Sequence, residues 1–310
     1  MEYELNLTND YLFRCVLGDR KNSAILLSFV NAVMEPKGFS RLSSIETVDP
    51  HLGGDSVTQK EAILDVRAVD ADGRQYDIEI QVRREPDYIK RSLYYLAKLY
   101  AGQLVSGDKY RNLKACIGIN LLDYIQFEDS PDLHSCFTLR SDIDPRFELT
   151  RELCLHYIEL PKLKRETYYT SLLEKWVYFI ENVYNSEDIM IEQMKSEVPE
   201  IDQAAQEYER MMADLAVKAR AMSREKWVRD QASYREAARE DGFAEGKAQG
   251  LAEGKAEGKA EGKAEGKAEG LLEGLLEAKR ETARKLKARG FELSEIAEIT
   301  NLSATEIANL

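Results

Sequence analysis

Two acidic residues, Asp65 and Glu79, lie in a stretch whose pattern would bring them side by side. The stretch at 61–83 reads EAILDVRAVDADGRQYDIEIQVR, and two runs of alternating apolar and polar residues flank the Ala-Asp-Gly tripeptide at 71–73. Strict alternation is typical of half-buried strands, because successive side chains point to opposite faces. A three-residue loop with glycine in the left-handed region is a common hairpin connection. The stretch therefore predicts a β-hairpin.

The register of this hairpin decides where the acids fall. Asp70 can pair with Gln75 or with Arg74, and the second pairing sets Asp65 directly opposite Glu79. It also separates the side chains into an apolar face and a polar face, which a slip of one residue would mix. The apolar face carries Ala62, Leu64, Val66, Ala68, Tyr76, Ile78, Ile80 and Val82, and the polar face carries Asp65, Arg67, Asp77, Glu79 and Gln81.

Two opposed carboxylates are suited to holding a cation. Directly opposed residues have Cβ atoms about 4.5–5.5 Å apart, and two like charges at that range are unfavourable without a proton or a cation between them. Mg²⁺ typically uses one or two carboxylates together with waters and substrate phosphate. Gln81 points to the same face and could orient water or phosphate. The alternative is a solvated sheet surface on which the two acids have no function. The strongly apolar residues that flank the acids argue against this alternative.

The elements around the hairpin predict a mixed α/β sheet. Thr8 or Asn9 can cap a helix that begins near Asp10, where an acid either favours the helix dipole or reaches the acidic face of the hairpin. Further helices are expected at 23–34 and after Pro86, and strands at 44–49, 113–122, 135–140 and 152–159. The order helix, hairpin, helix, buried strand is typical of such sheets. Lys90, Arg91, Lys98 and Lys109 lie along or after the helix that follows Pro86, as solvated bases or as phosphate contacts.

Composition limits the classes of function. The 310 residues carry a formal net charge of −13, so contact with nucleic acid must come from local basic patches. The first residues lack the pattern of a signal peptide, and the longest apolar stretch, at 24–34, is too short to span a bilayer. We therefore expect a cytoplasmic protein without a membrane segment.

The cysteines and histidines give no local signature of a metal site. Cys15, Cys116, Cys136 and Cys154 are widely spread without CxxC spacing, and they predict reduced, mostly buried thiols. His51, His134 and His156 lack metal-ligand spacing, and His156 is interpreted as a packing residue. No GxxxxGK[ST], GxSxG or HExxH motif occurs in the sequence.

Four segments together resemble the PD-(D/E)XK nuclease superfamily, and more narrowly its Rpn-type recombination-promoting nucleases. They are TNDYLFRCVLG at 8–18, ILDVRAVDADGRQYDIEIQ at 63–81, RREPDYIKRSLYYLAKLY at 83–100 and KACIGINLLDY at 114–124. The resemblance covers roughly residues 1–240 and implies a restriction-endonuclease-like mixed sheet flanked by helices. It implies that Asp65 and Glu79 bind the metal and that Asp10 is an auxiliary acid.

The resemblance implies a metal-dependent DNA endonuclease that hydrolyses phosphodiester bonds with Mg²⁺ or another divalent cation, linked to recombination or mobile elements. Two positions depart from the motif: Gln81 stands where lysine is usual, and Leu64 stands where proline is usual. Lys60 is a nearby source of the missing charge. The alternative is a catalytically inactive DNA-binding or regulatory protein on the same fold.

The C-terminal part predicts helices and a repeat. Helices are expected at 166–185 and 202–240, and nine of the eighteen glycines then recur at every fourth position from 242 to 274. Glycine disfavours helix, so this AEGK-like repeat predicts a marginal helix or a spacer, with an oligomer contact as the alternative. The tail resembles a helix-turn-helix module, with a protein-contact or dimer module as an equal alternative. The expected domains are 1–240, 241–275 and 276–310, with homo-oligomerisation through the C-terminal helices as an open alternative.

Overall fold

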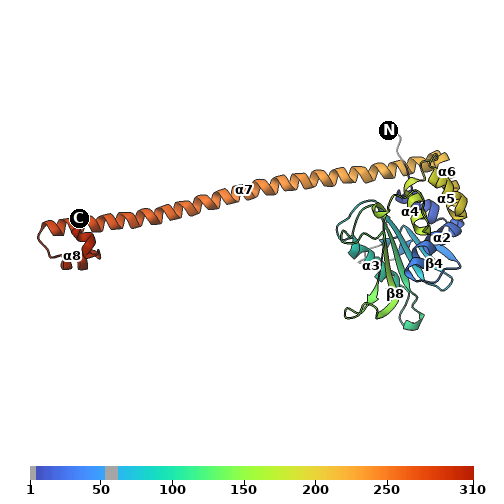
Figure 1. Cartoon of the computed structure of the whole chain (residues 1–310), viewed down its shortest axis with the longest axis horizontal. Helices are drawn as coiled ribbons and strands as arrows, with labels where there is room; N and C mark the ends of the chain where they lie inside the picture. Colours follow the sequence, from blue (N-terminus) through green and yellow to red (C-terminus); the bar gives the residue numbers. More distant parts are fainter. Residues whose placement is uncertain (1–4, 53–61) are drawn as a thin grey trace. The chain divides into compact units, whose positions relative to one another are not determined.

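The computed structural model describes residues 5–52 and 62–310, which fall into a first unit that ends at Arg229 and a second unit from Asp230 to Leu310. The strands are β1 (Ile45–Val48), β2 (His51–Leu52), β3 (Ala62–Ile63), β4 (Val66–Asp70), β5 (Gln75–Gln81), β6 (Cys116–Leu122), β7 (His134–Arg140) and β8 (Glu148–Glu159). Six of them form a mixed sheet in the order β1-β4-β5-β6-β8-β7, in which β5, β6 and β8 are parallel (Figure 1). Strands β2 and β3 form a separate antiparallel pair.

Helices cover both faces of this sheet. The α-helices of the first unit are α1 (Asp10–Leu17), α2 (Ser23–Met34), α3 (Tyr88–Ala101), α4 (Leu172–Asn182), α5 (Ile189–Glu197), α6 (Pro199–Ala213) and the beginning of α7 (Leu215–Ala288). Short 3₁₀ turns lie at Arg20–Asn22, Glu35–Lys37, Tyr110–Asn112 and Leu160–Lys162. Helix α3 lies on one face, and α2 and α4 lie on the other (Figure 1). Side chains of β6 alternate between the two cores, as Ile119 joins α2 and α4 while Leu122 joins α3.

The hairpin of β4 and β5 has the predicted register. Arg67 pairs with Asp77, and the Asp70 N–H donates to the Arg74 carbonyl over 3.1 Å. Gly73 has a φ of +81°, the left-handed value that the three-residue loop requires. The Asp70 carboxylate secures the loop, because it accepts hydrogen bonds from Arg74 Nε (2.6 Å) and from the Tyr76 hydroxyl (2.9 Å).

The first arm of the hairpin is not one continuous strand, and this corrects the expected face of Leu64. Ala62 and Ile63 belong to β3 and pair with β2, and the chain then bends before β4 begins at Val66. Leu64 is fully buried, but it packs with Tyr88 and Leu96 on the α3 face and not with Val66. The bend interrupts the period-2 alternation, so the sequence pattern assigned this side chain to the wrong face.

Other predicted elements appear with shifted boundaries. The strands expected at 44–49, 113–122, 135–140 and 152–159 correspond to β1, β6, β7 and β8, and the helix expected at 166–185 is α4. The prediction of a single helix at 202–240 was wrong, because α6 ends before Asp214 and α7 begins after it. Asp214 Oδ1 accepts the N–H of Ala216 over 2.8 Å, which caps the new helix.

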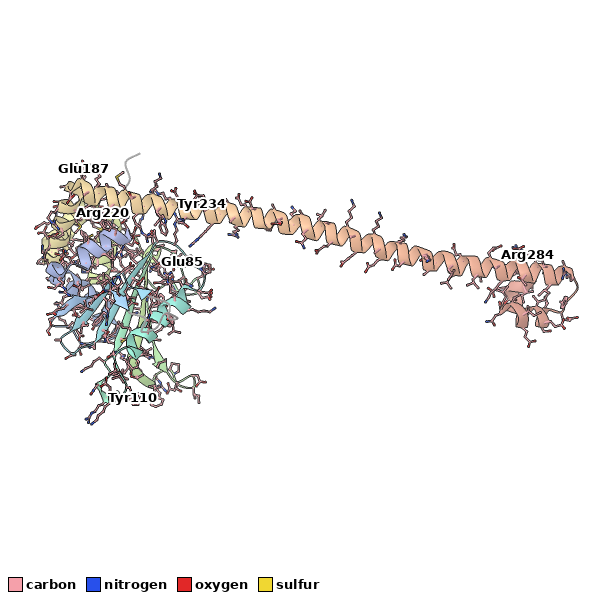
Figure 2. All side chains as sticks on the ribbon, turned by 180° about the vertical axis from the view of Figure 1, so that it is seen from behind. Glu85, Tyr110, Glu187, Arg220, Tyr234 and Arg284 are labelled. Carbon is pink, nitrogen blue, oxygen red and sulfur yellow. The ribbon has the colours of Figure 1, made fainter. Side chains whose placement is uncertain are left out.

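In the second unit, α7 contains the glycine repeat, and α8 (Leu293–Thr300) and α9 (Ala304–Ala308) follow it. Residues 233–278 are exposed along the helix, and Figure 2 shows their side chains projecting from it. Ala283, Ile296, Leu302 and Ile307 close a small core at the C-terminal end. The expected domain limits and the oligomeric contact stay predictions. No helix within 5–52 or 62–310 carries an apolar run sufficient to cross a lipid bilayer.

Replacing a repeat glycine with alanine will stabilise α7. A Cβ added at Gly258 meets no atom within 4 Å, so only the backbone preference for helix changes. That preference is worth about 1 kcal/mol, or roughly a fivefold change in an opening equilibrium. Amide hydrogen exchange in the full-length Gly258→Ala protein should therefore slow by about fivefold around residue 258. If the Gly258→Ala protein exchanges at the wild-type rate, glycine does not limit the stability of this exposed part of α7.

Candidate active site

Asp65 forms one hydrogen bond with Glu79 and one with the neighbouring residue Ile80 where β4 begins. The Asp65 N–H donates to Glu79 Oε1 over 3.1 Å, and the Ile80 N–H donates to Asp65 Oδ2 over 3.0 Å. The chain bends at Asp65, so its carboxylate takes the place of a strand carbonyl as the partner of Ile80. Gln81 Nε2 donates to Glu79 Oε2 over 3.2 Å. Three of the four predicted site residues are thus brought together.

Asp77 is a third acid beside this pair, and the sequence interpretation did not count it among the site residues. Its side chain is buried, and Asp77 Oδ1 has no hydrogen-bond partner among the described residues. Arg67 lies opposite it in the predicted register but donates to Gln75 Oε1 (3.1 Å) and to the Asp49 carbonyl (3.3 Å). The signal for Asp77 was its position two residues before Glu79 on the same strand face.

Burial makes it unfavourable for all three acids to carry charge together. Burial raises the pKa of Asp65 to about 6, opposed by the Ile80 N–H and increased by the charge of Asp10. Burial and the charge of Asp65 raise the pKa of Asp77 to about 8. The pKa of Glu79 lies well above its usual range because of burial and of the charges of Asp65 and Asp77. A divalent cation held by Asp65 and Glu79 would offset this repulsion, so the chemistry of this pair of acids fits a metal ion.

Asp10, the fourth predicted site residue, is held in an ion pair. Arg224 at the start of α7 donates from Nε to both carboxylate oxygens of Asp10, over 2.9 and 2.8 Å. The guanidinium also stacks over the Trp227 ring at 4.4 Å. Asp10 lies in the first turn of α1, which Asn9 caps, and its charge still raises the pKa of Asp65. Asp10 therefore lies beside the pair, with its carboxylate engaged by arginine.

Helix α3 forms the wall over the acidic face. The Tyr88 hydroxyl donates to Asn120 Oδ1 over 2.7 Å, and Asn120 pairs with Glu79 across β5 and β6. Arg91 lies over the Tyr88 ring at 4.8 Å, and its charge opposes the raised pKa of both Asp77 and Glu79. Arg91 is thus a base of the acidic face, whereas its neighbour Lys90 is exposed and pairs with Asp87. Lys60 lies outside the described residues.

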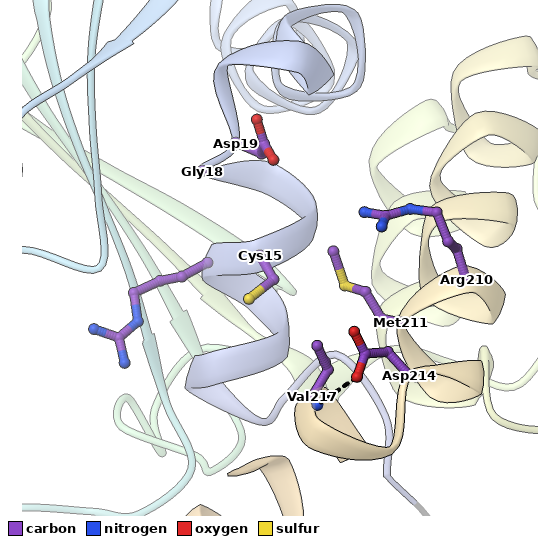
Figure 3. Close-up of a pocket in the computed structure, with 8 residues that line it drawn as sticks. Cys15, Gly18, Asp19, Arg210, Met211, Asp214 and Val217 are labelled. Carbon is purple, nitrogen blue, oxygen red and sulfur yellow. Dashed lines mark hydrogen bonds between the residues drawn. The ribbon is translucent and has the colours of Figure 1, made fainter. Parts of the chain in front are cut away.

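A separate cleft of about 370 Å³ lies between α1 and the junction of α6 and α7. Figure 3 shows Cys15, Met211 and Val217 facing one another across it. Its remaining lining residues are Arg14, Gly18, Asp19, Arg210 and Asp214. None of the three clustered acids lines this cleft, so we do not assign it to the candidate site.

The six-stranded mixed sheet with flanking helices has the restriction-endonuclease-like architecture of PD-(D/E)XK nucleases. The sequence profile of the PD-(D/E)XK nuclease family transposases matches residues 7–238. The chain belongs to this family, which confirms the resemblance found in the sequence. No curated protein and no solved structure matches the chain significantly.

A second pair of acids, both half-buried, allows a test of pH dependence away from the candidate site. Asp123 follows β6, and Glu181 lies on α4. Burial, with a contribution from the charge of Glu225, raises the pKa of Asp123 to about 6. Burial and then the charge of Asp123 raise the pKa of Glu181 to about 7. The folded protein therefore binds a proton at Glu181 more tightly than the unfolded chain does.

Glu181→Gln will stabilise the protein at pH 8 and change it little at pH 4. The folded pKa of Glu181 is raised, so its contribution to stability is full below about pH 4.5 and is lost as the pH rises through 7. The amide cannot ionise, so it avoids that loss, which we set at about 1 kcal/mol because the group is partly exposed. Urea unfolding at the two pH values measures it, with Glu174→Gln on the same helix as control. An equal effect at both pH values would contradict the assignment.

Proposed function

We propose that the protein is a divalent-metal-dependent endodeoxyribonuclease that hydrolyses phosphodiester bonds in DNA, in processes of recombination or mobile elements. Membership of a nuclease family supports the reaction class. The observation that carries the proposal is the hydrogen bond from the Asp65 N–H to Glu79 Oε1, which sets the buried Glu79 carboxylate beside the half-buried Asp65. We place this activity in the cytoplasm, where DNA is present and where the free thiols of this chain would stay reduced.

Asp65 and Glu79 would hold the ion, for which Mg²⁺ is our preferred candidate. When bound, such an ion stabilises the charge that develops on phosphate and makes a bound water more acidic. Gln81 fixes the orientation of Glu79 by donating to Oε2 over 3.2 Å. Its neutral amide carries no charge and transfers no proton, so Gln81 acts as a positioning residue.

The net charge of −13 repels DNA, so the attraction for DNA must come from local basic residues. The charges of Arg14 and Arg224 act on Asp65, and the charge of Arg91 acts on Glu79, while Arg224 is also paired with Asp10 and Arg91 with Glu85. Arg14 Nε donates to the Asp10 carbonyl over 3.2 Å, which keeps its guanidinium near the acids. Phosphate contacts of this kind position a duplex without reading its sequence.

The second candidate is a DNA-binding or regulatory protein without cleavage activity. The replacement of the usual lysine by Gln81 favours it, because the site then lacks a charged group at that position. The two candidates share the fold and the family, and they differ only in whether the bound phosphodiester is hydrolysed.

Cleavage of supercoiled plasmid with Mg²⁺, Mn²⁺, Ca²⁺ or EDTA distinguishes these candidates. The nuclease proposal predicts nicked and linear products with Mg²⁺ and Mn²⁺ and none with EDTA. A parallel mobility-shift assay in Ca²⁺ should show binding without cleavage. Binding with no cleavage in any metal would overturn the nuclease proposal in favour of the second candidate.

A further inference from the structure

Two cysteines and a histidine meet on the face of the sheet opposite the acids. Cys136 lies on the edge strand β7, and Cys154 and His156 lie on the neighbouring strand β8. Cys154 packs in the core with α2 and α4, whereas the acids lie under α3. The cluster is therefore separate from the candidate active site in both sheet face and strand.

The three donor atoms have the spacing of a metal site. The two Sγ atoms are 3.4 Å apart, and His156 Nε2 lies 3.2 Å from Cys154 Sγ and 3.8 Å from Cys136 Sγ. Around tetrahedral zinc, with Zn–S of about 2.3 Å and Zn–N of about 2.0 Å, the sulfurs lie about 3.8 Å apart and sulfur and nitrogen about 3.5 Å. Each observed distance is within about 0.4 Å of these values.

A second histidine fixes the orientation of the first. His134 Nε2 lies 2.8 Å from His156 Nδ1, so a hydrogen bond there can hold the proton on Nδ1 and leave the Nε2 lone pair facing the thiols. Histidines that bind metal characteristically use their other ring nitrogen in this way. Lys37 Nζ donates to the His134 carbonyl over 2.7 Å, which ties this histidine to the 3₁₀ turn after α2. His134 therefore already holds His156 in the orientation that a metal ligand needs.

The surroundings favour a neutral, enclosed complex. Cys154 and His156 are fully buried, and the Phe39 ring lies 5.6 Å from the His156 ring. Cys136 is only half-buried, so the cluster is accessible to an ion from this side, where water could act as a fourth ligand. Two thiolates balance the charge of one Zn²⁺, and sulfur and imidazole donors select zinc over Mg²⁺.

We propose that Cys136, Cys154 and His156 bind Zn²⁺, with water as the fourth ligand and His134 as a positioning residue. The ion would tie the edge strand β7 to β8, because its ligands come from both strands. The proposal does not depend on nuclease activity, since no acid of the candidate active site takes part.

Cobalt binding to the full-length, reduced protein tests the proposal. Co²⁺ bound by thiolate gives an intense near-ultraviolet charge-transfer band and tetrahedral visible bands, which carboxylate ligands do not produce. Wild-type protein should bind one such ion, and added Zn²⁺ should abolish the bands by displacement. Glu79→Ala protein should keep them, which separates this site from the acids.

Matched variants decide which residues bind. Cys136→Ser and His156→Gln should each lower Co²⁺ affinity at least about 100-fold, whereas Cys15→Ser, another half-buried cysteine, should not. Circular dichroism in EDTA confirms that each variant is folded. A rise in wild-type Tm with Zn²⁺ that is absent in Cys136→Ser supplies a second readout. Wild-type protein without a thiolate band, or a band retained in Cys136→Ser, would overturn the proposal.

Discussion

Glu79→Ala should lower plasmid cleavage in Mg²⁺ by at least about 100-fold while DNA binding in Ca²⁺ stays within a few-fold of wild type. Loss of residues that only support metal ligands commonly costs 10–100-fold, and a ligand should cost at least that. Glu79 also accepts hydrogen bonds from the Asp65 N–H and from Gln81, so its loss removes one carboxylate and takes the acceptor from both of these donors. Initial rates of nicking, together with a mobility-shift titration, measure the two effects.

The control for this experiment is Glu46→Ala. Glu46 is an exposed acid on β1, opposite Val69, at the edge of the same sheet. The Glu46→Ala protein should cleave plasmid at the wild-type rate. Glu79→Ala protein that cleaves as fast as Glu46→Ala protein would show that the activity does not come from this site.

The Asp10–Arg224 pair should show a coupling energy of about 1–3 kcal/mol in a double-mutant cycle. The pair is bidentate, with only 14% of the Asp10 side chain and 38% of the Arg224 side chain exposed, so its partners are more strongly coupled than those of a surface pair. Asp10→Ala, Arg224→Ala and the double variant, measured by urea unfolding, give the cycle. Arg229→Ala, further along α7, is the control variant.

The same variants separate two roles for Asp10. If Asp10 assists the chemistry, Asp10→Ala should lower cleavage well below that of Arg224→Ala, because the second variant keeps the carboxylate. If Asp10 serves only to fasten α7 to α1, the two variants should cleave equally. A cycle without coupling would contradict the pairing itself.

The hairpin could be predicted in detail because local rules determine it. Alternation, a left-handed glycine and one favourable register predict the Arg67–Asp77 pairing that the structure shows. The bend at Asp65 could not be predicted in this way. It depends on β3 pairing with β2 and on the Asp65 carboxylate replacing a strand carbonyl, and both are contacts between separate segments.

The partners of the acids and the thiol cluster also depend on distant segments. Arg224 is 214 residues from Asp10, and no spacing rule links them. Cys136 and Cys154 are 18 residues apart, a separation without the short spacing of a sequence motif. They meet because β7 and β8 run antiparallel, with Cys136 opposite His156. The sequence predicted mostly buried thiols, but it could not predict that these two are neighbours.

The hydrogen bond from the Ile80 amide to Asp65 Oδ2 has a consequence for spectroscopy. A metal ion coordinated by Asp65 Oδ2 must weaken or redirect the hydrogen bond from the Ile80 amide. The ¹⁵N–¹H resonance of Ile80 would then act as a built-in reporter of occupancy at the acids. Titrating Mg²⁺ while following this one signal would give the affinity of the site without any DNA present.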